Sequence, residues 1–107
     1  MAKGKDSWLV KCRVEPGMFK DEWLAYVDAI DPKNEGQLAK VQLFVDAREV
    51  RDVRGTPKRN EPAPAWLRVT LLAIRGDLAN VILPQPATPF GESIVVRGES
   101  VKETPAV

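Results

Sequence analysis

Histidine is absent from this chain of 107 residues, and cysteine occurs once, at Cys12. Histidine is the commonest general acid or base near neutral pH and the commonest metal ligand. Without it, and with one thiol, catalytic triads of the Ser-His or Cys-His kind and tetrahedral zinc sites lack their usual groups. The glycine motifs GxGxxG and GxxxxGK, which cradle phosphates, do not occur either. We therefore expect no cofactor and no metal, and among enzymes only those that work with carboxylates alone remain open.

Long apolar runs are missing as well. No stretch approaches the ~18 apolar residues that a membrane helix needs, and residues 1–6 are polar and charged, with no signal-peptide core behind them. A single cysteine cannot form an internal disulfide, which is typical of proteins in a reducing compartment. Cys12 lies on the apolar face of a predicted strand, so we expect a buried, unreactive thiol. These features predict a cytoplasmic protein that does not contact membranes.

An excess of charge of one sign is missing too. The chain has 16 Lys and Arg against 15 Asp and Glu, a net charge of +1, whereas a dedicated nucleic-acid binder usually carries a strong basic excess or stripe. The length suits one domain that can bury a core without a disulfide or a metal. We expect residues 1–6 to be a flexible leader, residues 7–97 to form a single β-barrel domain, and residues 98–107 to be a flexible C-terminal tail.

Short segments in which apolar and polar residues alternate run through the chain. This period-two pattern indicates half-buried strands. Glu15 precedes Pro16 and Gly17, which are placed as the two central residues of a type II turn. The prolines from Pro84 to Pro89 are expected to end the pairing of the strand before them. The clearest alternating segments are residues 7–14, 39–46, 66–74, 78–83 and 93–97.

Two further segments are ambiguous. Residues 21–30 fit a strand, which we favour, and also a helix with acidic residues in its first turn. Residues 47–53 either continue a strand or form one helical turn. The sum is an all-β fold: a small antiparallel barrel, SH3-like or related, of about five to seven short strands. The alternative is an α+β fold in which one of the two ambiguous segments is a short helix.

Residues 48–59 are rich in arginine and lysine, and residues 54–64 read as an exposed, proline-containing loop. Cations next to an exposed aromatic ring would follow a phosphate backbone and stack a base, and Lys11 and Arg13 would extend such a surface. The same charges also suit a loop that merely prevents aggregation. The candidate partner-binding residues, of which we expect the aromatic one to be exposed, are Arg51, Arg54, Lys58, Arg59, Trp66 and Arg68.

Four carboxylates lie close together in the sequence: Asp21, Glu22, Asp28 and Asp31. Two of them would serve as general acid and base, or would bind a hard cation. Their spacing does not match a calcium loop, and carboxylates in turns and at strand edges are ordinarily solvated. Solvation is the better interpretation of this cluster.

These observations predict a non-catalytic binding module that recognises another protein. The expected surface is the loop 54–64 with Trp66, or an unprotected sheet edge that accepts another strand and would also favour a homodimer. One alternative is a small nucleic-acid-binding β-barrel that uses the arginine-rich segment 48–59. A second alternative is a carboxylate-based enzyme, in which two acidic residues converge in a pocket.

Overall fold

Extended strands dominate the protein. The computed structural model describes residues 8–31, 33–34, 36–87 and 91–104. Both helical turns found there fall far short of the length and apolar character that a membrane-spanning helix requires. In this part of the chain the elements are, in order, β1 (Trp8–Pro16), β2 (Glu22–Ile30), β3 (Leu38–Asp46), the 3-10 turn η1 (Ala47–Glu49), β4 (Val50–Arg51), β5 (Ala63–Arg75), β6 (Leu78–Ala87), β7 (Gly91–Arg97), the 3-10 turn η2 (Gly98–Ser100) and β8 (Val101–Glu103).

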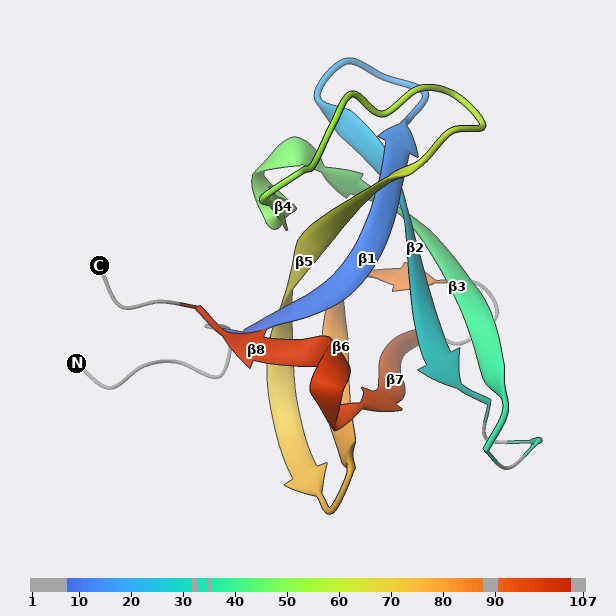
Figure 1. Ribbon diagram of the computed structural model, residues 1–107, viewed down its shortest axis with the longest axis vertical. Coiled ribbons are helices and arrows are strands. Elements are labelled where there is room, and N and C mark those ends of the chain that lie inside the picture. Colours follow the sequence, from blue (N-terminus) through green and yellow to red (C-terminus); the bar gives the residue numbers. More distant parts are fainter. Residues whose placement is uncertain (1–7, 32, 35, 88–90, 105–107) are drawn as a thin grey trace.

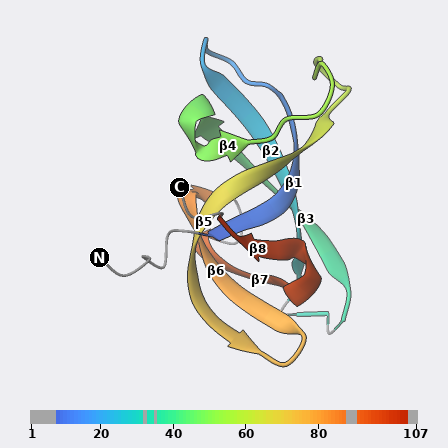
Figure 2. The same ribbon diagram turned by 60° about the vertical axis from the view of Figure 1, so that its left-hand side comes forward.

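One antiparallel sheet contains all of these strands. Its order is β3-β2-β1-β5-β6-β7, with β4 beside β5 and β8 beside β1. The long β5, of 13 residues, pairs with β1 through its first half and with β6 through its second half. The sheet curls about this strand so that β2 contacts β7 and β3 contacts β6 (Figure 1, Figure 2). The result is an open half-barrel, which confirms the predicted all-β antiparallel architecture.

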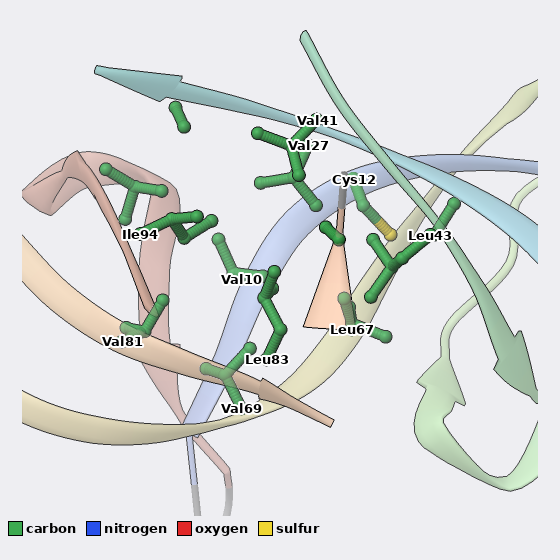
Figure 3. Packing of buried hydrophobic residues seen from close by; sticks show 14 of the residues in the cluster. Val10, Cys12, Val27, Val41, Leu43, Leu67, Val69, Val81, Leu83 and Ile94 are labelled. Atoms are coloured by element: carbon green, nitrogen blue, oxygen red, sulfur yellow. The ribbon is translucent and has the colours of Figure 1, made fainter. Parts of the chain in front are cut away.

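The core lies inside the curl and follows from the alternation of side chains along each strand. On β1, Val10, Cys12 and Val14 are buried, whereas Lys11 and Arg13 between them are exposed. Burial raises the pKa of the Cys12 thiol to about 12, because water no longer stabilises the thiolate. The predicted buried thiol is therefore confirmed. In Figure 3 Val10 and Cys12 of β1 lie among residues from the other long strands, which include Val27, Val41, Leu43, Leu67, Val69, Val81, Leu83 and Ile94.

The two ambiguous segments resolve differently. Residues 22–30 form β2, which pairs with both β1 and β3, so the strand that we favoured is confirmed. The second segment begins with η1, in which the Asp46 carboxylate accepts a hydrogen bond from the Arg48 backbone N–H. The chain then returns to an extended conformation in β4. Both interpretations of residues 47–53 are thus partly right, and neither segment is an α-helix.

The C-terminal segment differs from the flexible tail predicted over residues 98–107. Instead η2 and β8 lie there, and β8 pairs with β1, with Val101 opposite Val10. The prediction is therefore wrong as far as Glu103, because three residues with one apolar side chain make no recognisable period-two pattern. The leader predicted for residues 1–6 falls outside the described residues.

Strand β6 runs further than the sequence predicts. It passes the expected end at Pro84 and continues to Ala87. Its pairing with β7 is nevertheless interrupted between Ile82 and Ala87, where the prolines have no N–H to donate. The prolines thus break the ladder without ending the strand. Within the described residues β3 contacts β6 without pairing with it, so the curl does not close.

Candidate functional site

Three of the predicted binding residues come together on the outer face of the sheet, the face turned away from the core. Arg51 of β4 lies opposite Trp66 of β5, and Trp66 lies opposite Lys11 of β1. Residues that lie directly opposite each other in antiparallel strands place their side chains on the same face. Arg68, two residues further along β5, shares that face because side chains alternate. The strands therefore assemble a cluster of cations around Trp66.

Trp66 is half-buried, not exposed as the sequence suggests. The ammonium nitrogen of Lys102 lies 4.1 Å from the centroid of its ring, within cation–π range. Lys102 belongs to β8, which pairs with β1 on the side away from β5, and it lies opposite Leu9. To reach Trp66 on β5, the side chain of Lys102 therefore crosses the outer face of β1. Leu9 is accordingly buried. Sequence reasoning misses Lys102 because it places this segment in a flexible tail.

The guanidinium groups of two predicted arginines are already engaged. Arg68 Nε donates a hydrogen bond of 3.2 Å to Glu49 Oε1. Arg51 donates to the backbone carbonyl oxygens of Arg48 and Val50. An ion pair near the surface, such as that of Arg68 with Glu49, contributes at most about 1 kcal/mol, so a ligand with its own negative charge can replace it.

The other predicted binding residues, Arg54, Lys58 and Arg59, are exposed on the loop between β4 and β5. The Arg54 backbone N–H donates to the Pro64 carbonyl oxygen at 2.9 Å, and Lys58 pairs with Glu61 in a short β-bridge. Figure 1 shows this loop reaching past the end of β1. Lys58 and Arg59 therefore lie away from the cluster around Trp66, and the six predicted residues do not form one patch.

A buried carboxylate attaches this loop to the sheet. Glu15, 6% exposed, accepts a 2.7 Å hydrogen bond from the Tyr26 hydroxyl through Oε1, and its Oε2 accepts a 3.2 Å bond from the Asn60 backbone N–H. The hydrogen bond to Glu15, followed by partial burial and the negative charge of Glu15, raises the pKa of Tyr26. Sequence reasoning places Glu15 beside a turn and misses this contact, because no sequence signal links it to Asn60.

A second candidate surface is the edge of β3 that has no partner strand in the described part of the chain. Two backbone hydrogen bonds between opposite residues frame the β2–β3 ladder: Asp31 N–H to Gln37 O at 2.9 Å, and Ala47 N–H to Asp21 O at 2.8 Å. In an antiparallel ladder, hydrogen-bonded pairs alternate with pairs that are not hydrogen-bonded. The odd-numbered residues of β3 therefore bond to β2. The even-numbered residues direct their N–H and C=O groups away from it, and they define the free β3 edge: Leu38, Lys40, Gln42, Phe44 and Asp46.

The space beside the free β3 edge is open and partly apolar. Leu38 and Phe44 are exposed there. Edge strands are commonly protected by proline, by bulges or by several charges; the nine-residue β3 has no proline and only two charged residues, Lys40 and Asp46. The edge therefore has few of the features that keep other strands away. A hollow of about 460 Å³ next to it is lined by Leu24, Lys40, Gln42, Leu43, Phe44 and Pro86.

A further hollow, of about 700 Å³, lies at the end of the β5–β6 hairpin. Ile74 and Leu78 are exposed on its rim, and Trp8 packs against the core from the same side. The lining of this hollow carries charges of both signs, from Asp77, Arg97 and Glu99. The hollow therefore favours no single class of ligand.

The carboxylates are spread over the surface. Asp21, Asp28 and Asp46 are exposed, and Glu22 accepts hydrogen bonds from the backbone N–H groups of its own turn. Bonds from the Arg48 backbone N–H and then its side chain hold the pKa of Asp46 below its usual value, and the Lys33 backbone and the Asn34 side chain do the same for Asp31. Neither shift is in the direction that a general acid needs. No group of three metal-ligating side chains occurs in the described residues.

No known protein family matches this chain, and neither a curated protein nor a solved structure matches it. The arguments about function below therefore depend on the residues of this chain alone.

Proposed function

We propose that the protein is a non-catalytic binding module that takes up an extended segment of another protein along the free β3 edge. The observation that carries this proposal is the row of outward-facing backbone groups from Leu38 to Asp46, next to an open hollow. Strand addition uses such main-chain groups for affinity and the pockets beside them for specificity. A cytoplasmic location and an SH3-like arrangement of the strands belong to the same proposal.

The side chains of the edge specify what kind of segment would fit. Phe44, together with Leu24 and Pro86, offers apolar surface to an apolar side chain of the incoming strand. Lys40 and Asp46 stand near opposite ends of the edge, so a segment with an acidic residue at one end and a basic residue at the other would pair with both. The loop 54–64 is less suited, because its backbone is already bonded to Pro64 and Glu15.

A pair of variants at Gln42 tests this proposal. Gln42→Pro removes an outward N–H that β2 does not use, and Gln42→Thr keeps that N–H while changing the side chain. Peptides selected from a random library on the wild-type protein should bind the Gln42→Thr variant equally well. They should bind the Gln42→Pro variant about tenfold more weakly, because one main-chain hydrogen bond is removed. Peptides that bind all three proteins alike would contradict the proposal.

A second function, binding of single-stranded nucleic acid, is favoured by one observation. Lys11, Arg51 and Lys102 surround Trp66 on the outer face, and a hollow of about 420 Å³ beside them is lined in part by Lys11, Arg13 and Lys40. Cations that follow a phosphate backbone next to an aromatic ring are typical of such proteins. Lys102 would have to leave the ring of Trp66 for a base to stack on that side.

A further inference from the structure

We infer that the free β3 edge accepts a second copy of this chain, and that the two β3 strands pair antiparallel with Lys40 of each copy opposite Asp46 of the other. This inference depends on the proposed strand-addition function, since it names the partner of the same edge. A two-fold axis through Leu43 relates the two copies. Because each copy uses the same edge, the assembly stops at a dimer.

The hydrogen-bonding pattern of β3 limits the ways in which two copies can pair. Only even-numbered residues direct backbone groups outward, so an even-numbered residue must face an even-numbered residue of the second copy. The register can therefore change only in steps of two residues. For Lys40 the choices near the centre of the strand are Phe44, Asp46 or Arg48 of the second copy.

The charges of the edge select one of these registers. With Lys40 opposite Asp46, two pairs of opposite charge form, and Gln42 lies beside Phe44 of the second copy. With Lys40 opposite Phe44, both Lys40 and Asp46 lack a charged partner across the junction. In the register that puts Lys40 level with Arg48, which lies beyond β3 in η1, Asp46 lies opposite Gln42 and no pair of opposite charges forms within the strands.

The inner face of the junction fits the same register. Leu43 meets Leu43 of the second copy at the two-fold axis, and Val41 lies opposite Val45 on either side of it. These side chains are already buried inside each half-barrel. Pairing therefore places no charge on the inner face of the junction.

Other charged groups near the junction do not compete strongly with this pairing. Lys40 lies opposite Asp28 of β2, and its ammonium nitrogen is 5.7 Å from the centroid of the Tyr26 ring. Asp46 forms an exposed ion pair with Arg48 at 3.2 Å. Each of these contacts is exposed and weak, so Lys40 and Asp46 keep capacity for a partner from the second copy.

Cysteine cross-linking reads the register directly. Gln42→Cys and Phe44→Cys are placed on exposed positions, separately and in an equimolar mixture, while the native Cys12 stays buried. In the inferred register these two positions face each other across the junction, with Cα atoms about 5.5 Å apart, which a disulfide can span. Under mild oxidation the mixture should form covalent dimers at least about tenfold faster than either variant alone.

Each other outcome overturns the inference. Fastest cross-linking of Gln42→Cys alone, or of Phe44→Cys alone, would show a register shifted by two residues. A wild-type protein that sediments as a monomer up to about millimolar concentration, the range of the weakest specific complexes, would exclude the dimer. If selected peptides still require the Gln42 N–H in that case, the proposed function stands and only the self-pairing fails. A dimer that Gln42→Pro leaves intact would use another surface.

Discussion

The hydroxyl group of Tyr26 donates a 2.7 Å hydrogen bond to the carboxylate of Glu15, which is almost completely buried at the end of β1. The other carboxylate oxygen accepts a bond from the backbone of Asn60. One side chain of β1 thus connects β2 with the long loop between β4 and β5.

The first prediction concerns the ionisation of Tyr26, the sole tyrosine of the chain. Its pKa is raised in the native state by the hydrogen bond to Glu15, by burial and by the charge of Glu15. The native contact therefore contributes stability that is fully present below the pKa of the unfolded chain, about 10, and is lost as the pH rises through the native pKa. Tyrosinate absorbance should titrate at higher pH in the native protein than in urea.

The control for this titration is Glu15→Gln, which removes the charge but keeps an oxygen that accepts a hydrogen bond. The difference between the native and unfolded titrations should shrink in this variant without vanishing. An unchanged difference would mean that Glu15 does not cause the shift.

The second prediction concerns amide exchange along β3. The N–H groups of Val41, Leu43 and Val45 bond to β2 and should exchange slowly, whereas those of Lys40 and Gln42 face outward and should exchange quickly in dilute protein. Hydrogen–deuterium exchange followed by NMR resolves each position. Raising the protein concentration should slow the fast set alone if a second copy covers the edge; uniform protection in dilute protein would contradict the alternation.

The third prediction compares two proline substitutions one residue apart. Gln42→Pro removes an N–H without a partner in the ladder and should change the free energy of unfolding by about 1 kcal/mol or less. Val41→Pro removes a bond to β2 beside the core and should cost about 3 kcal/mol or more. Urea unfolding followed by tryptophan fluorescence measures both. Equal costs would show that the two amides do not differ as the ladder requires.

The fourth prediction exchanges charges across the inferred dimer. Lys40→Glu and Asp46→Lys each place like charges opposite each other, so each variant alone should self-associate about tenfold more weakly than wild type. A mixture of the two variants restores opposite charges at both ends and should form heterodimers as readily as wild type. Sedimentation equilibrium distinguishes these cases, and high salt should reduce the differences.

Thermal unfolding is the control for these variants, since it detects any loss of stability within a single copy. Such a loss is possible because Lys40 also lies opposite Asp28 and Asp46 also caps η1. If both single variants fold and associate as strongly as wild type, the pairing of Lys40 with Asp46 is wrong.

The fifth prediction tests the second candidate function. If single-stranded nucleic acid binds around Trp66, replacing Lys11, Arg51 and Lys102 by alanine should lower the slope of log affinity against log salt by about 0.7 for each phosphate that the protein no longer neutralises. Replacing the loop cations Arg54, Lys58 and Arg59 is the matched control and should change the slope less. Titration of RNA and single-stranded DNA at low salt measures both, and no binding by the wild type would remove this candidate.

The extent to which the sequence predicted the fold depends on how local each signal is. Period-two alternation identified the long strands, because each strand buries one face, and it correctly placed Cys12 inside. The turn at Gly17 shows where a local signal misleads. Its φ is not in the left-handed region that a type II turn requires; instead, an added Cβ would lie 2.7 Å from Glu22 Oε1, so the residue is needed for close approach.

The candidate site was harder to predict, because its contacts join segments far apart in the sequence. Nothing in the local pattern indicates that Lys102 reaches Trp66, or that Asn60 bonds to Glu15. Both contacts follow from strand order and register, which depend on pairing between distant segments. The cations of the segment 48–59 are therefore neighbours in the sequence but lie on two separate parts of the surface, the cluster around Trp66 and the loop between β4 and β5.

The pairing of β8 with β1 has a consequence for how the protein folds during its synthesis. Trp8 lies opposite Glu103, so β1 obtains one of its neighbours only when residues 101–103 have left the ribosome. Contacts between such distant segments slow folding. Until then the edge of β1 is exposed to other nascent chains, and a stalled or truncated chain that lacks β8 should be a preferred substrate for chaperones.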